Sequence, residues 1–273
     1  MAAETAARTA RSADGVPIRF AVTGAGEPTI VLVHGWATDR RLWDHHVPPL
    51  ADRHRVVTLD LAGHGESGAE RNDWTMAAFG ADVAAVVGGA SAEPVVLVGH
   101  SMGGPVVLEA ARRLAGRVRG IVLVDTLLDV ESRMPAEQVE ALARQLEADY
   151  VPVTTTMANE HLFASGTPAA VRGPVLRQLT ALPPHRSVGM LRSTWSYDPI
   201  PALREITAPI GAVNADKFPT NLEGNRRHMP GYEVEILPGV GHYPMLEDPA
   251  RFGAALGRMV ERVISRSRAG AGR

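Results

Sequence analysis

One serine of this sequence lies in a setting that suits nucleophilic chemistry. Ser101 stands between Gly99 and Gly103 and follows the apolar run 95–98. A serine on a tight turn from a strand to a helix has a strained backbone and tolerates only small residues two positions to either side. The two glycines meet that requirement. We therefore expect the Ser101 hydroxyl to project above a strand end, beside helix N–H groups that favour negative charge.

Four segments around this serine resemble the α/β-hydrolase superfamily, and they occur in the family's order: VHGW at 33–36, DLAGHGES at 60–67, GHSMGG at 99–104 and GVGHYPMLEDP at 239–249. The resemblance extends from about residue 15 to 264. It implies Ser101 as the nucleophile and His242 as its base, because a hydroxyl is a poor nucleophile until an imidazole takes its proton. It also implies an oxyanion hole made by the backbone N–H groups of Trp36 and Met102, with the Trp36 indole beside the acyl pocket.

Two aspartates compete for the third position of a catalytic triad. The acid must accept the N–H of His242 from the carboxyl end of a strand near the serine. Asp216 follows the strand at the position that most of the family uses, but PIGAVNADKF lacks the usual Gly-x-x-Asp turn. Asp125 ends the preceding strand in IVLVDT, a position that a minority of the family uses. We favour Asp125 narrowly and keep Asp216 as the alternative.

The other histidines have structural interpretations. We expect His34 to stabilise a turn, His64 to be structural, and His45 and His46 to face solvent. No histidine spacing such as H-E-x-x-H predicts a metal site, and cysteine is absent. The resemblance implies no cofactor.

Short apolar runs alternate with helical segments, which predicts a mostly parallel sheet covered on both faces. We expect strands at 29–33, 56–59, 95–98, 121–124, 210–213 and 234–237, and helices that include 76–87 and 105–114. Residues 14–33 indicate two strands joined by a Gly-rich turn, hence an antiparallel start. With the resemblance, the expected fold is an eight-stranded α/β-hydrolase sheet with a helical cap between strands 6 and 7.

The strand rhythm breaks once, and this break defines the expected domains. Residues 126–206 show only helical spacing and are expected to form a cap, or lid, over a core of residues 15–125 and 207–264. Residues 1–14 and 265–273 are expected to be disordered or flexible tails. The candidates for an apolar substrate pocket are Trp36 and six cap residues: Met157, Leu162, Phe163, Met190, Leu191 and Trp195.

Composition limits the partners that we expect. The formal net charge is -2, and the arginines are interleaved with acids, so no basic field for nucleic acid is indicated. No leader-like apolar segment or membrane span appears, and the expected location is the cytoplasm. A monomer and a homodimer remain equally open.

The leading interpretation is a serine hydrolase that cleaves a carboxylic ester or lactone of an apolar small molecule. Two alternatives use the same fold. A cofactor-free oxygenase or a lyase would use His242 on a substrate proton, and a ligand receptor would bind without turnover.

Overall fold

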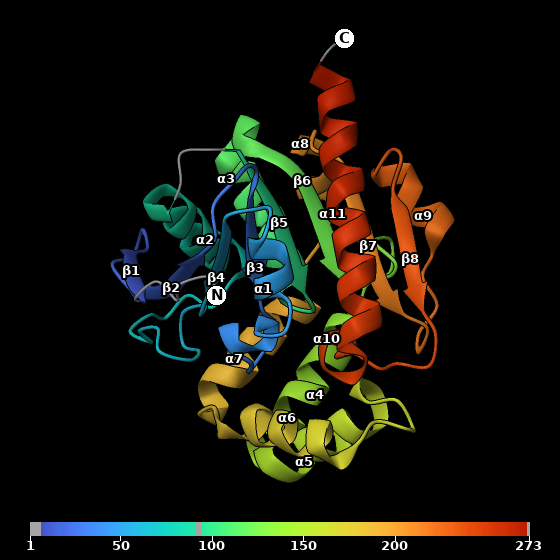
Figure 1. Cartoon of the computed structure of the whole chain (residues 1–273). Helices are drawn as coiled ribbons and strands as arrows, with labels where there is room; N and C mark the ends of the chain where they lie inside the picture. The colour runs from blue at the N-terminus through green and yellow to red at the C-terminus, as the bar shows by residue number, and fades with distance from the viewer. Residues whose placement is uncertain (1–6, 91–93, 272–273) are drawn as a thin grey trace.

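The computed structural model describes residues 7–90 and 94–271 and is built around one eight-stranded sheet (Figure 1). The strand order is β1-β2-β4-β3-β5-β6-β7-β8. β2 runs antiparallel to β1 and β4, and every other neighbouring pair is parallel, which confirms the mostly parallel sheet. The strands are β1 (Arg8–Arg11), β2 (Pro17–Thr23), β3 (Thr29–Val33), β4 (Val56–Leu59), β5 (Val95–His100), β6 (Val118–Val124), β7 (Ile210–Ala215) and β8 (Glu233–Leu237).

The central strands are β-branched and apolar because both of their faces are covered. β3, β4 and β5 are buried at every position. Their register aligns the carboxyl ends: Val33 pairs with Gly99, His100 with Val124, and Val124 with Val213. The segments that follow β3, β5, β6 and β7 therefore start at one edge of the sheet.

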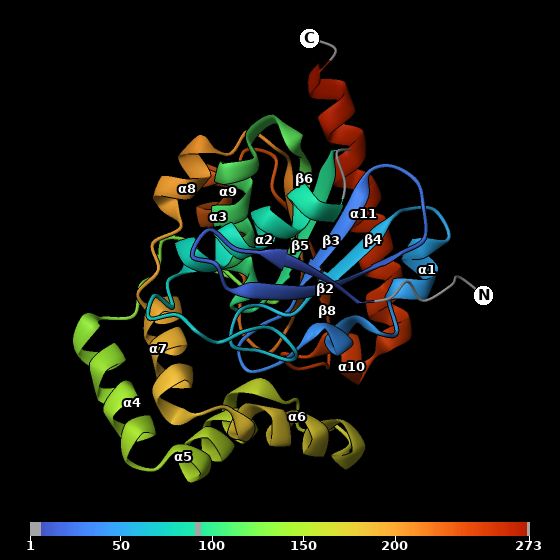
Figure 2. The same ribbon diagram turned by 90° about the vertical axis from the view of Figure 1, so that its left-hand side faces the viewer.

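Helices cover the two faces of the sheet (Figures 1 and 2). On one face, α2 (Met76–Ala90) packs on α3 (Gly103–Leu114), and α3 contacts β5 and β6. On the other face, α11 (Pro249–Ala271) lies along β6, β7 and β8, and α1 (Val47–Ala51) contacts β2 and β4. Short elements complete the core: η1 (Arg40–Trp43), η2 (Ala115–Arg117), α9 (Leu222–His228) and α10 (Pro244–Glu247).

All but the last of the inserted helices between β6 and β7 lie beyond the carboxyl edge of the sheet, as Figure 1 shows. This cap consists of α4 (Ala136–Ala148), α5 (Tyr150–Met157), the π-helix η3 (Ala158–Leu162), α6 (Ala169–Ala181) and α7 (Pro184–Trp195). The last inserted helix, α8 (Ile200–Glu205), packs on α3 and α9 instead. The cap helices therefore end at Trp195, short of the expected boundary at 206.

Part of the expected N-terminal tail is ordered structure. Arg8–Arg11 form β1, paired with β2, and the Ser12 hydroxyl donates to the buried carboxylate of Asp82 at 2.5 Å. The prediction of disorder is wrong for these residues, because backbone pairing with a free strand edge needs no apolar side chains. Residues 1–6 lie outside the described part of the chain.

Two other expectations also need correction. The two strands in residues 14–33 are not a hairpin: β2 pairs with β1 and β4, so β4 separates it from β3. The C-terminal tail is helical to Ala271, and Arg266 donates to the carbonyl of Pro230 at 3.2 Å. Helix-forming residues continue the turns of α11 beyond the packed core. Among the described helices, none is both long and apolar enough to cross a membrane.

Candidate active site

Ser101 occupies the turn between β5 and α3. Its backbone φ is 53°, in the left-handed region that residues other than glycine rarely adopt. Its N–H donates to the Val124 carbonyl at 3.1 Å, and its own carbonyl accepts from Thr126 Oγ1 at 2.8 Å. The end of the neighbouring strand β6 therefore holds the strained turn in place.

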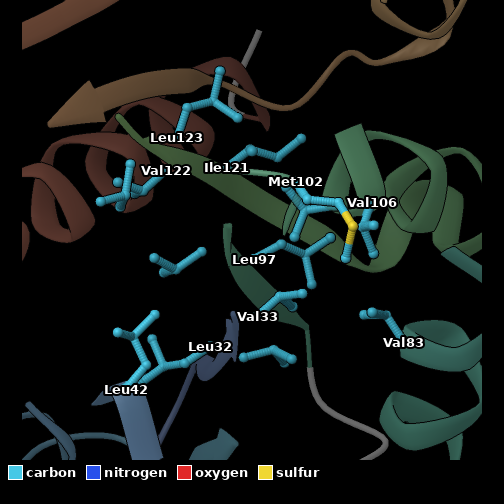
Figure 3. Packing of buried hydrophobic residues seen from close by; sticks show 14 of the residues in the cluster. Leu32, Val33, Leu42, Val83, Leu97, Met102, Val106, Ile121, Val122 and Leu123 are labelled. Carbon is cyan, nitrogen blue, oxygen red and sulfur yellow. The ribbon is translucent and has the colours of Figure 1, made fainter. Parts of the chain in front are cut away.

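The glycines around Ser101 are required by close backbone contacts. A Cβ at Gly99 would lie 2.3 Å from the Gly103 carbonyl oxygen, and a Cβ at Gly103 would lie 2.7 Å from the His34 carbonyl oxygen. A Cβ at Gly35 would lie 2.9 Å from the Ser101 Cβ. The turn thus packs directly on the loop that follows β3. Figure 3 shows the Met102 side chain in the core beside Val106, where it is only 1% exposed.

Asp125 and His242 are joined by a short hydrogen bond. His242 Nδ1 lies 2.6 Å from Asp125 Oδ2, and Asp125 Oδ1 accepts the N–H of Ala215 at 2.9 Å. Burial by itself would raise the pKa of the Asp125 carboxyl, but the hydrogen bond and charge of His242 and the Ala215 N–H hold that pKa below its usual range. An ionised carboxylate only accepts, so His242 Nδ1 donates its N–H to Asp125, and in the neutral imidazole Nε2 is then the acceptor.

Asp216 lies elsewhere. It is exposed, and its Oδ1 accepts the N–H of Gly239 at 2.9 Å in the loop before His242. No contact joins its carboxylate to the imidazole in the described structure. Because the turn after β7 is short, the Asp216 carboxylate reaches only the loop that follows β8. The His242 Nδ1 faces Asp125 instead.

Ser101 and His242 lie at the same edge of the sheet. His100, the residue before Ser101, places Nε2 2.8 Å from the His242 carbonyl, and the two imidazole rings are 4.7 Å apart. The described structure has no hydrogen bond between the Ser101 hydroxyl and His242 Nε2. Such bonds commonly tighten only when substrate is bound.

Trp36 and Met102 present backbone donors on the two sides of this turn. Trp36 follows β3 in the loop against Ser101, and Met102 is the N-cap residue of α3. Within the described residues, neither backbone N–H donates to a protein acceptor. Two unpaired N–H groups beside a half-buried hydroxyl form a site for developing negative charge.

Two buried histidines hold the Trp36 loop from the core side. His34 Nε2 accepts the N–H of Leu61 at 3.0 Å, and His64 Nε2 accepts the N–H of Ala37 at 3.2 Å. Both residues are structural, as predicted. Burial lowers the pKa of both rings, that of His64 to about 3. They are therefore neutral and serve as acceptors.

His46 departs from the sequence expectation. It is 2% exposed, its Nε2 lies 3.0 Å from the Met245 carbonyl, and its ring packs on Phe252 at 4.9 Å. The prediction that it faces solvent is wrong, because α11 covers its side of α1. His45 is exposed.

Three groups to which the sequence analysis gave no such role hold the His242 loop. They are the His100 ring described above, the Leu162 carbonyl, which accepts the N–H of His242 at 2.6 Å, and the carboxylate of Glu247. Glu247 accepts the N–H of Gly241 at 2.9 Å and the hydroxyl of Thr167 at 2.5 Å. His100 and Glu247 lie inside the motifs that carry the resemblance, and this position could have identified them. The Leu162 contact depends on where the cap docks and had no signal.

A cavity of about 570 Å³ lies among the cap helices. Three of the predicted pocket residues line it: Met157, Leu162 and Trp195. The other four, Trp36, Phe163, Met190 and Leu191, are at most 6% exposed and are absent from its lining. The remaining lining is largely apolar, and its polar members, Gln145, Thr156, Glu160 and His161, include neither lysine nor arginine. None of the lining residues belongs to the Ser101 turn or to the His242 loop, and the link to the site is the Leu162 carbonyl, which accepts the N–H of His242.

Comparison with known proteins assigns the family. The sequence profile of the alpha/beta hydrolase family matches residues 30–255, so the chain belongs to the alpha/beta hydrolase family and is an enzyme of the hydrolase class. A thermophilic esterase from Thermogutta terrifontis has a similar fold, with a TM-score of 0.82 at 24% identity over 95% of this chain and 99% of the esterase. An enol-lactonase from Burkholderia xenovorans has a TM-score of 0.79 at 19% identity over 93% and 100% of the two chains.

Similarity to curated proteins is mostly partial. The chain is 38% identical over 111 residues, 41% of its length, to the dihydrolipoyllysine-residue acetyltransferase component of an acetoin cleaving system from Cupriavidus necator, and covers 30% of that protein. It is 40% identical over 105 residues to a pimeloyl-[acyl-carrier protein] methyl ester esterase from Methylococcus capsulatus, 38% of this chain and 39% of the esterase. The chain thus spans less than half of either relative.

Proposed function

We propose that the protein is a serine hydrolase that cleaves a carboxylic ester or lactone of an apolar small molecule through an acyl-enzyme on Ser101. The observation that carries this proposal is the 2.6 Å hydrogen bond between Asp125 and His242, at the same strand edge as the strained Ser101 turn. A structural histidine would not need a buried carboxylate on one nitrogen and an unpaired acceptor on the other.

The roles of the residues follow from this geometry. Ser101 Oγ attacks the substrate carbonyl carbon, and its proton passes to His242 Nε2. The oxyanion that forms accepts hydrogen bonds from the N–H groups of Trp36 and Met102. When the tetrahedral intermediate collapses, His242 gives the proton to the departing alkoxide and Asp125 stabilises the imidazolium. Water, deprotonated by His242, then attacks the acyl group and releases the acid; from a lactone, the released product is one hydroxy acid.

The cap supports an uncharged, apolar substrate. Its cavity has no lysine or arginine in its lining and includes the carboxylate of Glu160, which disfavours a phosphate or carboxylate there. The printed names of similar proteins, an esterase, an enol-lactonase and a methyl ester esterase, agree with ester or lactone cleavage.

Turnover and covalent labelling test the function directly. A series of p-nitrophenyl esters from acetate to laurate should be hydrolysed, with a preference for acyl chains that fill the cap cavity. A fluorophosphonate probe should add once to the protein, as seen by intact mass, and should not add to Ser101→Ala. Ligand binding without turnover would indicate a receptor. Abstraction of a proton from the substrate by His242, without formation of an acyl-enzyme, would indicate the oxygenase or lyase alternative.

A further inference from the structure

A buried chain of hydrogen bonds connects the loop after β3 to three cap helices. The Trp36 indole N–H donates to Ser187 Oγ in α7 at 2.8 Å, and Ser187 Oγ lies 2.6 Å from the Tyr150 hydroxyl in α5. The Tyr150 hydroxyl donates to the Leu179 carbonyl in α6 at 2.7 Å. The cap thus holds the side chain of a residue whose backbone belongs to the candidate oxyanion hole.

The chemistry of its two ends gives this chain one direction. An indole N–H only donates and a carbonyl oxygen only accepts. The Ser187 hydroxyl must therefore accept the Trp36 N–H and donate to the Tyr150 hydroxyl. The Tyr150 hydroxyl in turn donates its hydrogen bond to the Leu179 carbonyl. The three side chains are 6%, 0% and 6% exposed, so water cannot replace a lost partner.

The loop of Trp36 is consequently held from two sides. On the core side, His64 accepts the N–H of Ala37, whose φ of 54° lies in the left-handed region. On the cap side, the indole is held by Ser187. A strained backbone persists only where the surroundings over-determine it, and here the cap supplies one of the holding contacts.

We propose that Ser187 and Tyr150 are positioning residues for the oxyanion hole: through the Trp36 indole, they fix the Trp36 backbone N–H at the distance that the transition state requires. The helical cap is then part of the catalytic machinery as well as a cover for the substrate. This inference rests on the proposed function of Ser101 and Trp36.

The test compares two hydroxyl deletions with a matched control. Ser187→Ala breaks the chain at its centre, and Tyr150→Phe removes only its outer half. Tyr197→Phe removes a hydroxyl that also joins the inserted segment to the core, by a 2.8 Å hydrogen bond to Glu109 in α3, and it takes no part in the chain from Trp36 to Leu179. Because complete loss of one oxyanion donor costs ~10²- to 10³-fold in kcat, displacement of a donor should cost about 10-fold.

We expect kcat on p-nitrophenyl acetate to fall about 10-fold in Ser187→Ala and less in Tyr150→Phe, with KM unchanged in both, because an oxyanion contact acts in the transition state. Inhibition by phenylboronic acid, whose tetrahedral serine adduct places an oxygen in the same hole, should weaken by a similar factor. Tyr197→Phe should match the wild type in kcat and in boronate affinity.

Three outcomes overturn the inference: wild-type kcat in both deletions, a rise in KM alone, or an equal loss in all three variants. If Ser187→Ala does not fold, the graded loss in Tyr150→Phe against Tyr197→Phe decides the question. Failure of the proposed function would be recognised separately, because the wild type would then escape fluorophosphonate labelling or Ser101→Ala would remain active.

Discussion

Asp125 Oδ2 lies 2.6 Å from His242 Nδ1, although 117 residues separate the two in the chain. The contact exists because β6, β7 and β8 are successive neighbours in the sheet. The segments that follow β6 and β8 therefore lie at the same edge. Asp216, the aspartate nearer in sequence, faces the Gly239 amide instead. The short loop after β7 thus leaves Asp125 as the aspartate that contacts the His242 ring.

The assignment of the acid is tested by two isosteric changes. Asp125→Asn would present an amide that favours the wrong imidazole tautomer, and kcat should fall by up to ~10⁴-fold. Asp216→Asn keeps an oxygen acceptor for Gly239 and should cost less than about threefold in rate. Steady-state kinetics on one ester decides between them. A crippled Asp216→Asn enzyme beside an active Asp125→Asn enzyme would reverse the assignment.

Ser101 and His242 should act as one unit. Ser101→Ala and His242→Ala should each remove most of the activity, and the double variant should lose little more, because neither group works without the other. Circular dichroism and thermal melts should show folded protein in all three. Rate losses that multiply in the double variant would argue against a shared step.

The turn glycines should tolerate no side chain. In Gly99→Ala the new Cβ would lie 2.3 Å from the Gly103 carbonyl oxygen. The backbone at Gly99 or Gly103 must then move, and the Ser101 turn between them moves with it. We expect a loss of several kcal/mol of stability or of soluble expression. Gly88→Ala is the control, because Gly88 is an exposed position of α2 with no atom near its Cβ. This change should stabilise the protein by about 0.5–1 kcal/mol. Equal effects of the two changes would refute the steric explanation.

Stability should decline on the acid side because of buried neutral histidines. Burial lowers the pKa of His64 and of His100 to about 3. The unfolded chain, with histidine pKa values near ~6.5, then binds more protons between these limits, so stability falls as pH drops through that range. For each histidine the loss from pH 7 to pH 5 is about 2 kcal/mol. Urea titrations should show a shallower pH dependence for His64→Gln than for the wild type, and an identical dependence would contradict the calculation.

Glu247 should matter more than an exposed glutamate. Its Oε2 accepts from Gly241 and Thr167 and its Oε1 accepts the N–H of Tyr243, so in either orientation the amide of Glu247→Gln places its NH₂ against one of these donors. The expected loss is about 1–3 kcal/mol, which lowers Tm by several degrees. Glu131→Gln, which weakens an exposed ion pair with Arg227, should lower Tm by less than Glu247→Gln does. Differential scanning calorimetry compares the two, and a larger loss at Glu131 would contradict the prediction.

The local patterns of this sequence determined the sheet and the Ser101 turn. Strands covered on both faces are apolar along their buried length, so β3, β4, β5, β6 and β7 are visible as short runs, whereas β8 is partly exposed. The turn at Ser101 leaves no room for a Cβ at Gly99 or Gly103, so its geometry is written in adjacent residues. Both are constraints that act within a few positions of the chain.

Contacts between distant segments were decided only by the tertiary structure. Arg8–Arg11 became a strand because β2 offered a free edge, and His46 was buried because α11 covers it. The choice of Asp125 over Asp216 and the chain from Trp36 to Tyr150 depend on how loops and cap helices dock. Such contacts follow from the relative placement of whole elements, which no local pattern of residue types specifies.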